Sequence, residues 1–569
     1  MHKFLRVNMN TKEVDFQEVK DDYTLFGGRG LIAKIMNEEV DPQCDPLGEN
    51  NKLILCPGLL TGTMAPCSGR LSIGGKSPLT GTIKEANVGG VAAQLMAKLG
   101  LKAVIVEGKQ DDDSLYMLII SKDGAELVPA GKYAGMNNYA LAEALHADFG
   151  SKIGIVSIGC AGERGYRNST IQVTDTAGNP SRAAARGGLG AVMGAKGLKA
   201  IILNVSGPSD SQYADKESFK TAAQNFTAGV RDNAFSGKVL PGFGTAALVT
   251  AVNAMGALPT NNFSTGSFER AEEISGERLA EIHSQRGGSN GHACQAGCVI
   301  SCSNVYNDEQ GNYLTSGLEY ETIVLNGSNC GISSLDIIAK IDRMCDDLGL
   351  DTIETGATIG VCMEAGKIVF GDGEGSLRLL QEMTDGTEFG RLLGQGTELA
   401  GKALGVKRIP TVKGQSLAAY DPRSLKGTGV TYATSPMGAD HTAGNTIGSR
   451  GVKPHLKEGQ VEASTQAQVT MAALDNLGIC LFTSTCLGKP ENIGHLVSMV
   501  QAKVGGEWDA DKLFATGITT LSMEKVFNKK AGFTEKDNTL PEFMYSESLP
   551  GSNNIFDILP DEMDKAIPF

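Results

Sequence analysis

The chain has 569 residues, which is too many for a single hydrophobic core and indicates roughly two to four domains. Its composition, 41% hydrophobic and 20% charged, is that of an ordinary globular protein. The net charge of −14 disfavours nucleic acid as a partner, because binding phosphates requires a basic surface, but it allows a small carbonyl substrate.

The N-terminus and the cysteines indicate the compartment. Met1 leads directly into a strand-like run at residues 4–9, so we expect no signal peptide. No apolar stretch approaches the ~18 residues that a membrane-spanning helix needs. We therefore expect a cytoplasmic protein whose cysteines are reduced thiols, available for metals rather than disulfides.

Residues 1 to about 205 are predicted to be rich in β-strands. The run from Leu5 to Val19 has the pattern of a hairpin that turns near residues 10–12. Residues 91–99 show helical spacing between strands. Short apolar runs bounded by Gly or Pro predict further strands at residues 52–56, 103–107, 116–120, 153–157 and 200–204.

After a Ser-Gly-Pro-Ser-Asp loop at residues 206–210 the pattern becomes helical. Helical spacing covers residues 216–231, 337–348, 353–365 and 377–382. A second boundary is predicted near residues 405–414, and an acidic, Pro-bearing segment from Asp537 onward reads as a wrapped or loose tail. We predict an α+β protein with domains at residues 1–208, 209–410 and 411–569.

A triplet of evenly spaced cysteines, Cys294, Cys298 and Cys302, is the strongest chemical signal. Three such thiolates could bind one soft metal centre, and a cubane iron–sulfur cluster takes four cysteines. The best candidate for the fourth is Cys480. Two other interpretations stay open, namely three buried structural cysteines and a zinc site that includes His292.

One short motif occurs twice. Asp346-Asp-Leu-Gly-Leu-Asp351 and Asp475-Asn-Leu-Gly-Ile-Cys480 both follow a helical run. They could be two helix ends capped by glycine. Alternatively, a carboxylate in each could accept hydrogen bonds from an amino-pyrimidine edge, which presents donors side by side. Two such pockets would suit a cofactor with two similar halves.

Taken together, these motifs resemble the aldehyde ferredoxin oxidoreductase family of tungsten- or molybdenum-dependent bis-pterin enzymes. The resemblance covers nearly the whole chain and implies a β-rich N-terminal saddle of two sheets, followed by two mainly helical domains. Besides the motifs above, it rests on Gly27-Gly-Arg-Gly30, Cys67-Ser-Gly-Arg70, Ser77-Pro-Leu-Thr-Gly81, Glu85-Ala-Asn-Val-Gly-Gly90, Arg186-Gly-Gly-Leu-Gly-Ala-Val-Met-Gly-Ala-Lys-Gly-Leu-Lys-Ala200, Gly317-Leu-Glu-Tyr-Glu-Thr322 and Ala433-Thr-Ser-Pro-Met-Gly-Ala-Asp-His441.

The resemblance implies roles in binding a bis-molybdopterin. Arg70 would lie between the cluster and a pterin phosphate, and backbone carbonyls of Asn87 and Ala183 would bind a Mg²⁺ ion that bridges the phosphates. One pterin would contact Asp346, Gly349 and Asp351, and the other Asp475, Gly478 and Ile479. The remaining expected cofactor-binding residues are Gly187, Gly188 and Lys196.

The resemblance also implies a [4Fe-4S] cluster bound by Cys294, Cys298, Cys302 and Cys480. The chain departs from the family's Cys-x₂-Cys-x₃-Cys pattern, because three residues separate its first two cysteines. Glu319 and His441 are the catalytic candidates, as a general base and a proton donor. Glu321 is the rival to Glu319, and neighbours two apart on one element point in different directions.

The resemblance thus predicts an enzyme that oxidises a small aldehyde to a carboxylic acid. Electrons would pass through the cluster to ferredoxin or a ferredoxin-like subunit. The protein would be a homodimer or part of a hetero-oligomer. Two alternatives are a catalytic subunit of a larger complex that acts on another substrate, such as an aromatic thioester, and a pterin-free iron–sulfur electron-transfer protein.

Overall fold

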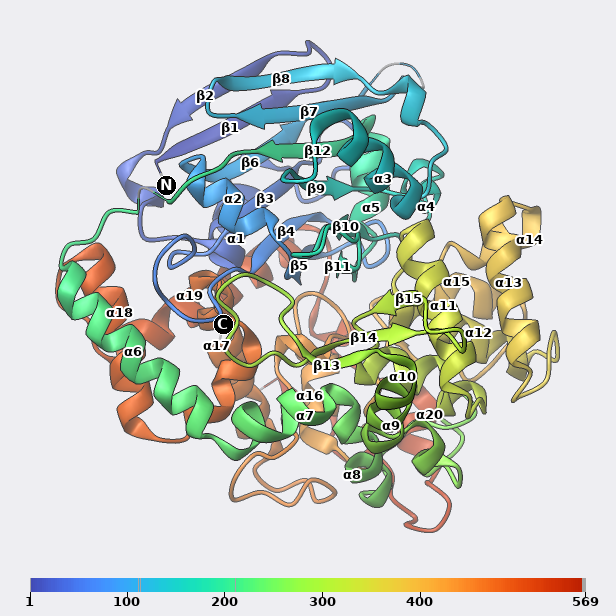
Figure 1. Ribbon diagram of the computed structural model, residues 1–569. Coiled ribbons are helices and arrows are strands. Elements are labelled where there is room, and N and C mark those ends of the chain that lie inside the picture. Colours follow the sequence, from blue (N-terminus) through green and yellow to red (C-terminus); the bar gives the residue numbers. More distant parts are fainter. Residues whose placement is uncertain (1, 111, 113, 210, 565–569) are drawn as a thin grey trace.

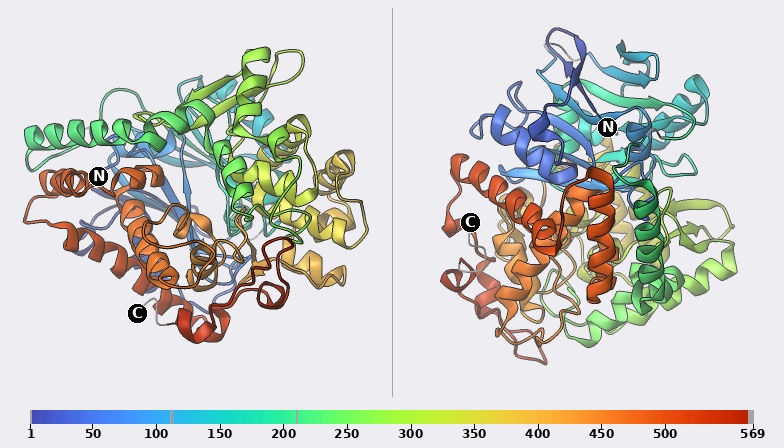
Figure 2. Two further views of the ribbon diagram at one scale, coloured as in Figure 1. Left: turned by 90° about the horizontal axis from the view of Figure 1, so that it is seen from below. Right: turned by 90° about the vertical axis from the view of Figure 1, so that its left-hand side faces the viewer.

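The computed structural model describes residues 2–564, apart from residues 111, 113 and 210. Two six-stranded sheets form the N-terminal region, and the remainder is mainly helical (Figure 1). This arrangement confirms the predicted α+β class. In Figure 2 the sheets lie on one side of the molecule and the helices on the other.

The first sheet has the strand order β2-β1-β6-β3-β4-β5. Strands β1 and β6 are parallel, and the other neighbouring strands are antiparallel. The strands span Lys3–Asn8 (β1), Val14–Glu18 (β2), Leu53–Pro57 (β3), Leu71–Lys76 (β4), Ile83–Val88 (β5) and Leu101–Glu107 (β6).

The second sheet repeats the topology of the first, with the order β8-β7-β12-β9-β10-β11. Again only one neighbouring pair, β7 and β12, is parallel among the described residues. The strands span Tyr116–Ser121 (β7), Gly124–Pro129 (β8), Gly154–Ser157 (β9), Ile171–Val173 (β10), Arg182–Ala184 (β11) and Leu198–Asn204 (β12). The N-terminal region is therefore a structural duplication.

The helices of the two halves match in the same way. Helix α1 (Gly28–Glu39) corresponds to α3 (Asn138–Phe149), and α2 (Ala92–Lys98) to α5 (Leu189–Ala195); the short α4 (Cys160–Glu163) has no counterpart. The sequence keeps a trace of this repeat, because a Gly-Gly pair precedes both α2 and α5 and a Gly-Leu-Lys-Ala segment follows both.

Successive side chains of a strand point to opposite faces of the sheet, so each strand supplies apolar residues to both faces. Inward residues such as Leu5, Val7 and Ile201 form one core between the two sheets, together with α2 and α5. Outward residues of the first sheet pack under α1. Outward residues of the second sheet pack under α3 in the same manner.

The rest of the chain begins with α6 and holds the long helices. Its helices are α6 (Lys216–Asp232), α7 (Leu240–Phe243), α8 (Leu248–Ala254), α9 (Gly276–Arg286), α10 (Tyr320–Asn326), α11 (Leu335–Leu348), α12 (Thr352–Glu364), α13 (Gly373–Asp385), α14 (Glu388–Leu393), α15 (Thr397–Ala403), α16 (Lys426–Thr434), α17 (Gln460–Leu477), α18 (Pro490–Val504), α19 (Ala510–Lys530), α20 (Glu542–Ser546) and α21 (Pro560–Met563).

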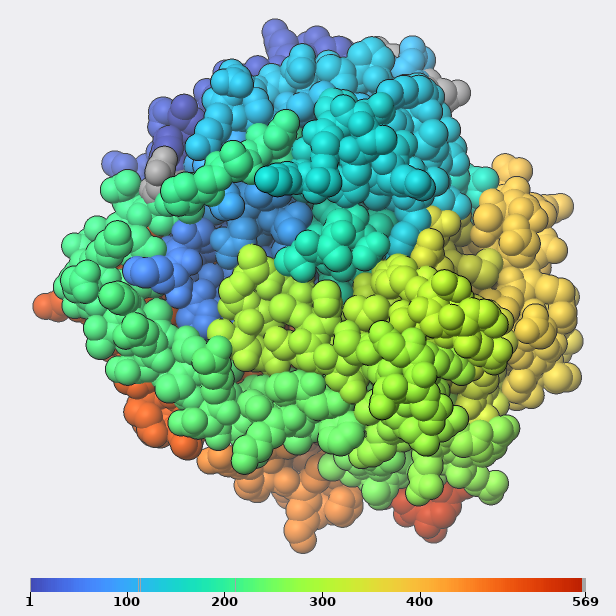
Figure 3. Space-filling model, in the orientation of Figure 1, coloured from blue at the N-terminus to red at the C-terminus, as the bar shows by residue number. Residues whose placement is uncertain are grey.

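Two small sheets accompany these helices. One has the strands β13 (Ser289–His292), β14 (Ser303–Asn307) and β15 (Tyr313–Ser316), and the other has β16 (Thr411–Val412) and β17 (Gln415–Ser416). The segment between β13 and β14 carries the cysteine triplet and reaches the surface in the middle of the face shown in Figure 3 (yellow-green).

Helix α19 joins the two regions, because it packs against both α17 and α1. Helices α6 and α18 pair on the outside (Figure 1). The C-terminal segment wraps around the helical core, since Leu540, Phe543 and Phe556 are buried in it. The tail from Asp537 onward was expected to be either wrapped or loose, and its described part up to residue 564 is wrapped. Residues 565–569 lie outside the described residues.

The predicted hairpin, the predicted strands and the predicted helices are all present. In the N-terminal region, strands β4, β5, β8, β10 and β11 and helices α1, α3, α4 and α5 were not predicted. Helix α1 begins within Gly-Gly-Arg-Gly, and glycine is unfavourable inside helices, so the sequence pattern did not indicate a helix there. No single described helix is long and apolar enough to span a membrane; one bent pair, Phe235–Phe243 with Thr245–Ala254, meets the criteria jointly by length and composition.

Candidate functional site

The first Asp-x-Leu-Gly motif ends helix α11 and lies against the second sheet. The Thr170 N–H donates to the Gly349 carbonyl at 2.9 Å, and the Asp351 N–H donates to the Asn168 carbonyl at 3.0 Å. A Cβ at Gly159 would lie only 2.3 Å from the Leu348 carbonyl oxygen. The backbones of the two segments therefore touch without room for a side chain.

The second motif ends helix α17 and lies against the first sheet in the same way. The Arg70 N–H donates to the Gly478 carbonyl at 3.1 Å, and the Leu60 N–H donates to the Leu477 carbonyl at 3.0 Å. A Cβ at Gly58 would lie 2.0 Å from Gly478 N. Gly58 directly follows β3, and Gly159 follows the matching strand β9. The two motifs thus occupy equivalent places on the duplicated sheets.

Asp475 of the second motif belongs to a buried group of charges. Arg29 Nη1 lies 3.4 Å from Asp475 Oδ2, and Arg29 also binds Glu524 through two hydrogen bonds of 2.7 and 2.8 Å. Burial raises the pKa of Asp475 to about 6, although Arg29 opposes the change. Burial and the nearby Asp475 raise the pKa of Glu85 to about 8. Burial in this group of charges therefore makes both carboxyl groups weaker acids than usual.

Asp346 of the first motif is buried as well. Burial and the neighbouring Asp342 raise the pKa of Asp346 well above its ordinary value. The compensating charge comes from Arg182, a buried guanidinium that donates to Ser303 Oγ at 2.8 Å. Its Nε and Nη2 atoms have no hydrogen-bond partner in the protein. Two unused donors on a buried arginine indicate that a ligand completes the site.

Asp351 caps helix α12, since its Oδ1 accepts the Ile353 N–H at 2.9 Å. Its Oδ2 accepts a hydrogen bond from Arg186 Nε at 3.2 Å. Arg186 also donates to the backbone carbonyls of Ala439 and Ser416, both at 2.8 Å. One guanidinium thus fixes the first motif to the segment that carries His441.

Arg70 and Asn87 lie together at the boundary between the sheets and the cysteines. Arg70 Nε donates to Asn87 Oδ1 at 2.5 Å, and Nη2 donates to the Asn87 carbonyl at 3.0 Å. Ala183 lies on β11, which contacts β5, the strand of Asn87. Asn87 Nδ2 lies 3.4 Å from Asp475 Oδ1. These predicted cofactor residues are therefore neighbours in space.

Gly187 and Gly188 precede helix α5 with left-handed φ values of 89° and 75°. A Cβ at Gly188 would lie 2.3 Å from the Arg167 carbonyl oxygen, so only glycine fits there. Lys196, by contrast, donates to the backbone carbonyls of Asn51 and Gly108 at 2.5 and 2.9 Å. Because its ammonium joins loops of the first sheet, we do not include Lys196 in the proposed cofactor site.

The four predicted cluster cysteines converge. Each of the pairs among Cys294, Cys298, Cys302 and Cys480 interacts electrostatically. The Cys298 thiol and burial raise the pKa of Cys294 well above its ordinary value, and burial raises that of Cys480 to about 12. The four thiols therefore share one space, in which Cys302 and Cys480 are buried and Cys294 and Cys298 half-buried. A positively charged metal cluster there would favour the thiolates.

Arg70 lies beside this group. A Cβ at Gly89 would lie 3.2 Å from Arg70 Nη1 and 3.3 Å from Cys294 Sγ, so both flank the same glycine. Within the described residues, no three His, Cys, Asp or Glu side chains are grouped to bind a single metal ion.

The structure separates the two glutamates. Glu319 Oε2 accepts a hydrogen bond from Thr245 Oγ1 at 2.6 Å. Glu321 Oε1 lies 3.3 Å from His441 Nε2, and its Oε2 accepts the Ala419 N–H at 2.7 Å. Burial raises the pKa of Glu321, while His441 opposes the change. Glu321 rather than Glu319 is therefore the partner of His441, and it replaces Glu319 as our candidate.

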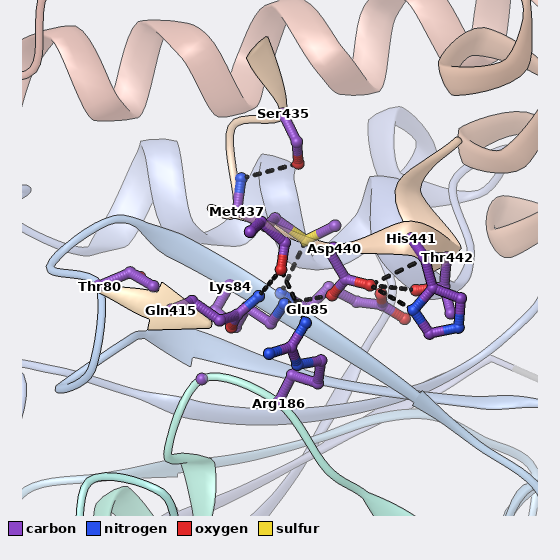
Figure 4. A network of polar contacts seen from close by, with 12 residues as sticks. Thr80, Lys84, Glu85, Arg186, Gln415, Ser435, Met437, Asp440, His441 and Thr442 are labelled. Atoms are coloured by element: carbon purple, nitrogen blue, oxygen red, sulfur yellow. Dashed lines mark hydrogen bonds and ion pairs between the residues drawn. The ribbon is translucent and has the colours of Figure 1, made fainter. Parts of the chain in front are cut away.

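A charge network holds the His441 segment in place (Figure 4). Lys84 Nζ lies 2.7 Å from Asp440 Oδ2, with both side chains buried. Burial alone would raise the pKa of Asp440, but Lys84 and Arg186 outweigh it and hold the pKa below its ordinary value. His441 Nδ1 and Glu321 Oε1 have no hydrogen-bond partner in the protein. His441 Nδ1 is thus available to a ligand, whereas Glu321 Oε1 already lies 3.3 Å from His441 Nε2.

The sequence reasoning missed two buried side chains at this site. Arg182 directly precedes the predicted Ala183, and its unpaired nitrogens are the stronger signal, which only the structure supplies. Gln295 lies between the first two cluster cysteines in the chain, and neither of its amide atoms has a partner. An arginine within a small-residue loop, Ser181-Arg-Ala-Ala, was the one available hint.

Family models match both regions of the chain. The model described as "Aldehyde ferredoxin oxidoreductase, N-terminal domain" matches residues 4–205, and "Aldehyde ferredoxin oxidoreductase, domains 2 & 3" matches residues 221–568. These two ranges meet near the end of the duplicated sheets.

Known proteins are similar over nearly the full length. The chain is 34% identical to a tungsten-containing aldehyde ferredoxin oxidoreductase of Thermococcus kodakarensis and 33% identical to that of Pyrococcus furiosus; each match covers 97% of this chain and 92% of the relative. An aliphatic sulfonate oxidoreductase, WOR-like subunit, of Pyrococcus furiosus is 29% identical over 80% of this chain and 77% of that protein.

A solved structure has the same fold. It is the active site complex BamBC of benzoyl coenzyme A reductase in complex with 1,5-dienoyl-CoA. The match has a TM-score of 0.80 and 19% identity, and covers 99% of this chain and 93% of the other.

The glycine contact between β3 and the second motif can be tested by Gly58→Ala. We expect a loss of about 1–3 kcal/mol in stability, because the added methyl group overlaps the Gly478 backbone. Thermal unfolding followed by circular dichroism measures the change. Gly131→Ala is the matched control, since a Cβ there meets nothing within 4 Å. An unchanged unfolding temperature for Gly58→Ala would contradict the contact.

The Lys84–Asp440 pair predicts a second effect on stability. Asp440→Asn should cost about 3–5 kcal/mol, because it leaves a buried ammonium without its counter-charge. The lowered pKa of Asp440 means that this stabilisation is present above the unfolded pKa of about 3.9 and is lost as the pH falls through the lower folded value. The difference between variant and wild type should therefore shrink in acid.

The unfolding temperature of Asp440→Asn, measured from neutral to acidic pH, checks this expectation. The double variant Lys84→Met, Asp440→Leu should recover part of the loss, because neither charge then remains buried alone. Arg270→Gln breaks an exposed pair with Glu273 and should leave the unfolding temperature unchanged. Equal unfolding temperatures for Asp440→Asn and Arg270→Gln would refute the role of the pair.

Proposed function

Because this chain belongs to the aldehyde ferredoxin oxidoreductase family and is therefore an oxidoreductase, we propose that it oxidises an aldehyde to a carboxylic acid at a tungsten–bis-pterin centre. Molybdenum is the alternative metal. The balanced reaction converts an aldehyde and water into an acid, two protons and two electrons. We further propose that a ferredoxin or a ferredoxin-like subunit accepts the electrons.

One observation carries this proposal. Two helix ends with the same motif occupy equivalent positions on two duplicated sheets, and Asp346 and Asp475 both have raised pKa values. A cofactor with two similar halves would meet similar surroundings on both sides. The carboxyl groups would exchange hydrogen bonds with the amino-pyrimidine edges of the two pterins.

The remaining cofactor contacts follow from groups that the protein leaves unsatisfied. Arg182 offers two buried donors without partners, and Arg70 lies between Asn87 and Cys294. Both guanidinium groups suit phosphate or sulfur atoms of a pterin. The carbonyls of Asn87 and Ala183, on strands in contact, are the proposed Mg²⁺ ligands.

Four converging thiols support a [4Fe-4S] cluster bound by Cys294, Cys298, Cys302 and Cys480. Cys480 lies two residues after Gly478, so the same helix end would serve both the pterin and the cluster. The four cysteines would hold a cluster that would supply one-electron transfer, and the tungsten–pterin centre would supply two-electron oxidation when bound. The exposed residues Ala296 and Gly297 bring the cysteine segment to the surface, where an electron acceptor can dock.

Glu321 and His441 are the proposed catalytic pair. The Glu321 carboxylate would remove a proton from the attacking water, and His441 would donate a hydrogen bond to the carbonyl oxygen of the aldehyde. Their contact of 3.3 Å aligns the two groups, and His441 Nδ1 has no hydrogen-bond partner in the protein. Glu319 accepts the Thr245 hydroxyl hydrogen bond instead of contacting His441, so we do not propose it as the base.

A second candidate function is that of a catalytic subunit in a larger complex. The similarity to a WOR-like subunit of an aliphatic sulfonate oxidoreductase favours it. Purification separates the two possibilities. An enzyme that purifies alone and reduces a viologen dye with simple aldehydes would support the first proposal, whereas co-purifying subunits and no reaction with aldehydes would support the second.

The metal content tests the proposed function directly. Protein purified without oxygen from cells supplied with both metals should contain one tungsten or molybdenum and about four irons per chain. Cys480→Ala should lose the cluster or keep a three-iron form, because one iron would lack its thiolate. Elemental analysis and electron paramagnetic resonance measure both quantities.

Cys486 provides the matched control. It is buried six residues after Cys480, and its thiol donates to the Thr483 carbonyl rather than facing the other cysteines. Cys486→Ala should keep four irons and full activity. A normal four-iron signal in Cys480→Ala would refute its assignment, and iron without tungsten or molybdenum in the wild type would refute the proposed function.

Glu321→Gln should lower kcat by about 10²- to 10⁴-fold, the usual contribution of a general base. Glu319→Gln, the control, should change kcat much less, because a glutamine can still accept the Thr245 hydrogen bond. Since the pKa of Glu321 is raised, wild-type activity should fall on the acid side at a pH above the ordinary glutamate range.

Steady-state kinetics across pH, with the metal content measured in every variant, checks this prediction. Loss of the acid limb in Glu321→Gln at unchanged tungsten content would support the role of general base. A large loss of kcat in Glu319→Gln, together with an active Glu321→Gln, would return the assignment to Glu319.

A further inference from the structure

The side chain of Asn168 is buried without a hydrogen-bond partner. It is 1% exposed, and neither its Oδ1 nor its Nδ2 is hydrogen-bonded to any described residue. The hydroxyl of the next residue, Ser169, is fully buried and equally unpaired within the described chain. Buried polar groups are nearly always hydrogen-bonded, so these unpaired groups indicate a partner from outside the chain. The proposed function does not yet account for either residue.

The duplication of the sheets gives Asn168 a counterpart in the first sheet, Cys67. Each lies nine residues after the glycine at which its sheet touches a motif. The Cys67 carbonyl accepts the Cys480 N–H of the second motif at 3.0 Å. The Asn168 carbonyl accepts the Asp351 N–H of the first motif, also at 3.0 Å. Asn168 therefore lies beside the first motif as Cys67 lies beside the second.

The stretch from Arg167 to Ser169 is enclosed by the first motif and the glycine-rich start of helix α5. On one side, Ser169 forms a β-bridge with Leu350 of the motif. On the other side, a Cβ at Gly188 would lie 2.3 Å from the Arg167 carbonyl oxygen. A Cβ at Gly190 would lie 2.9 Å from Ser169 Oγ. Both flanking elements carry residues of the proposed cofactor site, so the unpaired side chains lie between two parts of that site.

We propose that the Asn168 amide recognises the amino-pyrimidine edge of the first pterin. This inference rests on the proposed function and adds a binding residue to it. A primary amide presents a donor and an acceptor side by side, which complements the donor and acceptor on the pyrimidine edge of a pterin. Asparagine forms the same kind of two-point contact with adenine in DNA. The Ser169 hydroxyl supplies one further group that can donate or accept.

This contact makes the two pterin positions unequal. At the first motif, an amide occupies the place that Cys67 occupies at the second, next to the proposed cluster ligand Cys480. A cofactor with two similar halves would thus have the two-point contact on one side and the proposed outlet for electrons on the other. Removal of the amide should therefore weaken cofactor binding and leave the cluster in place.

Asn168→Leu tests the contact, because it keeps the approximate size of the side chain and removes both polar groups. The affinity for the cofactor should fall by about tenfold, as expected for two hydrogen bonds of ordinary net strength. Pterin and tungsten per chain should fall, while iron stays at about four. Fluorescence of the extracted pterin and elemental analysis measure these quantities. Ser169→Ala removes a single hydroxyl, guards against a folding defect in the first variant, and should lower the pterin content by a smaller amount.

The unfolding temperature provides a readout that does not depend on activity. In full-length protein from cells that make no pterin, Asn168→Leu should not lower it, because no hydrogen bond within the described chain is lost. In cofactor-loaded protein, the same variant should lower it. Asn329→Leu is the matched control, since the Asn329 amide is also fully buried and unpaired but lies beside Gly360 of α12. This control should leave pterin and tungsten unchanged.

The outcomes separate this inference from the proposed function. Wild-type protein without pterin would refute the proposed function itself. Wild type with pterin, together with unchanged pterin content in both Asn168→Leu and Ser169→Ala, would refute the role of Asn168 alone. An equal fall in the unfolding temperature of cofactor-free and cofactor-loaded Asn168→Leu would indicate a structural role, such as a contact with an internal water, and would overturn the inference.

Discussion

The close approach of backbone to backbone at two helix ends is the constraint on which the rest of the structure depends. Gly58 and Gly159 follow equivalent strands of the two sheets, and at each the chain touches an Asp-x-Leu-Gly motif with no space for a Cβ. This contact brings residues from distant parts of the chain to one place. The Gly159 contact holds the Asp346 motif against the second sheet, and the Gly58 contact holds the Asp475 motif against the first sheet, where the Arg70 N–H donates to the Gly478 carbonyl.

Buried charges then orient the site. Arg186 joins Asp351 to the segment of His441, and Lys84 holds Asp440 of the same segment from the first sheet. Each partner would be costly to bury alone, so the network forms as a unit when the helical region docks on the sheets. The buried atoms that remain without partners, above all on Arg182, mark the space that the protein leaves to a ligand.

The duplication of the sheets explains why a two-fold cofactor suits a chain without two-fold sequence symmetry. The topology repeats strand for strand, while the side chains have diverged. Only one half carries the cysteine that would continue to a cluster, since Cys480 follows the second motif where Asp351 follows the first. Electrons would therefore leave the site on one side only, where the cysteine segment reaches the surface.

Local patterns in the sequence were sufficient to predict strands β1, β2, β3, β6, β7, β9 and β12 and helices α2, α6, α11, α12 and α13, because hydrophobic period and turn residues act over a few neighbouring residues. The same local patterns singled out the cysteine triplet and the repeated motif. Partners of single side chains were not predictable in this way. Glu321 rather than Glu319 meets His441, Lys196 binds backbone carbonyls, and the Cys67 N–H donates to the Gly297 carbonyl. These contacts join segments far apart in the chain, and only the packing of the helices on the sheets decides them.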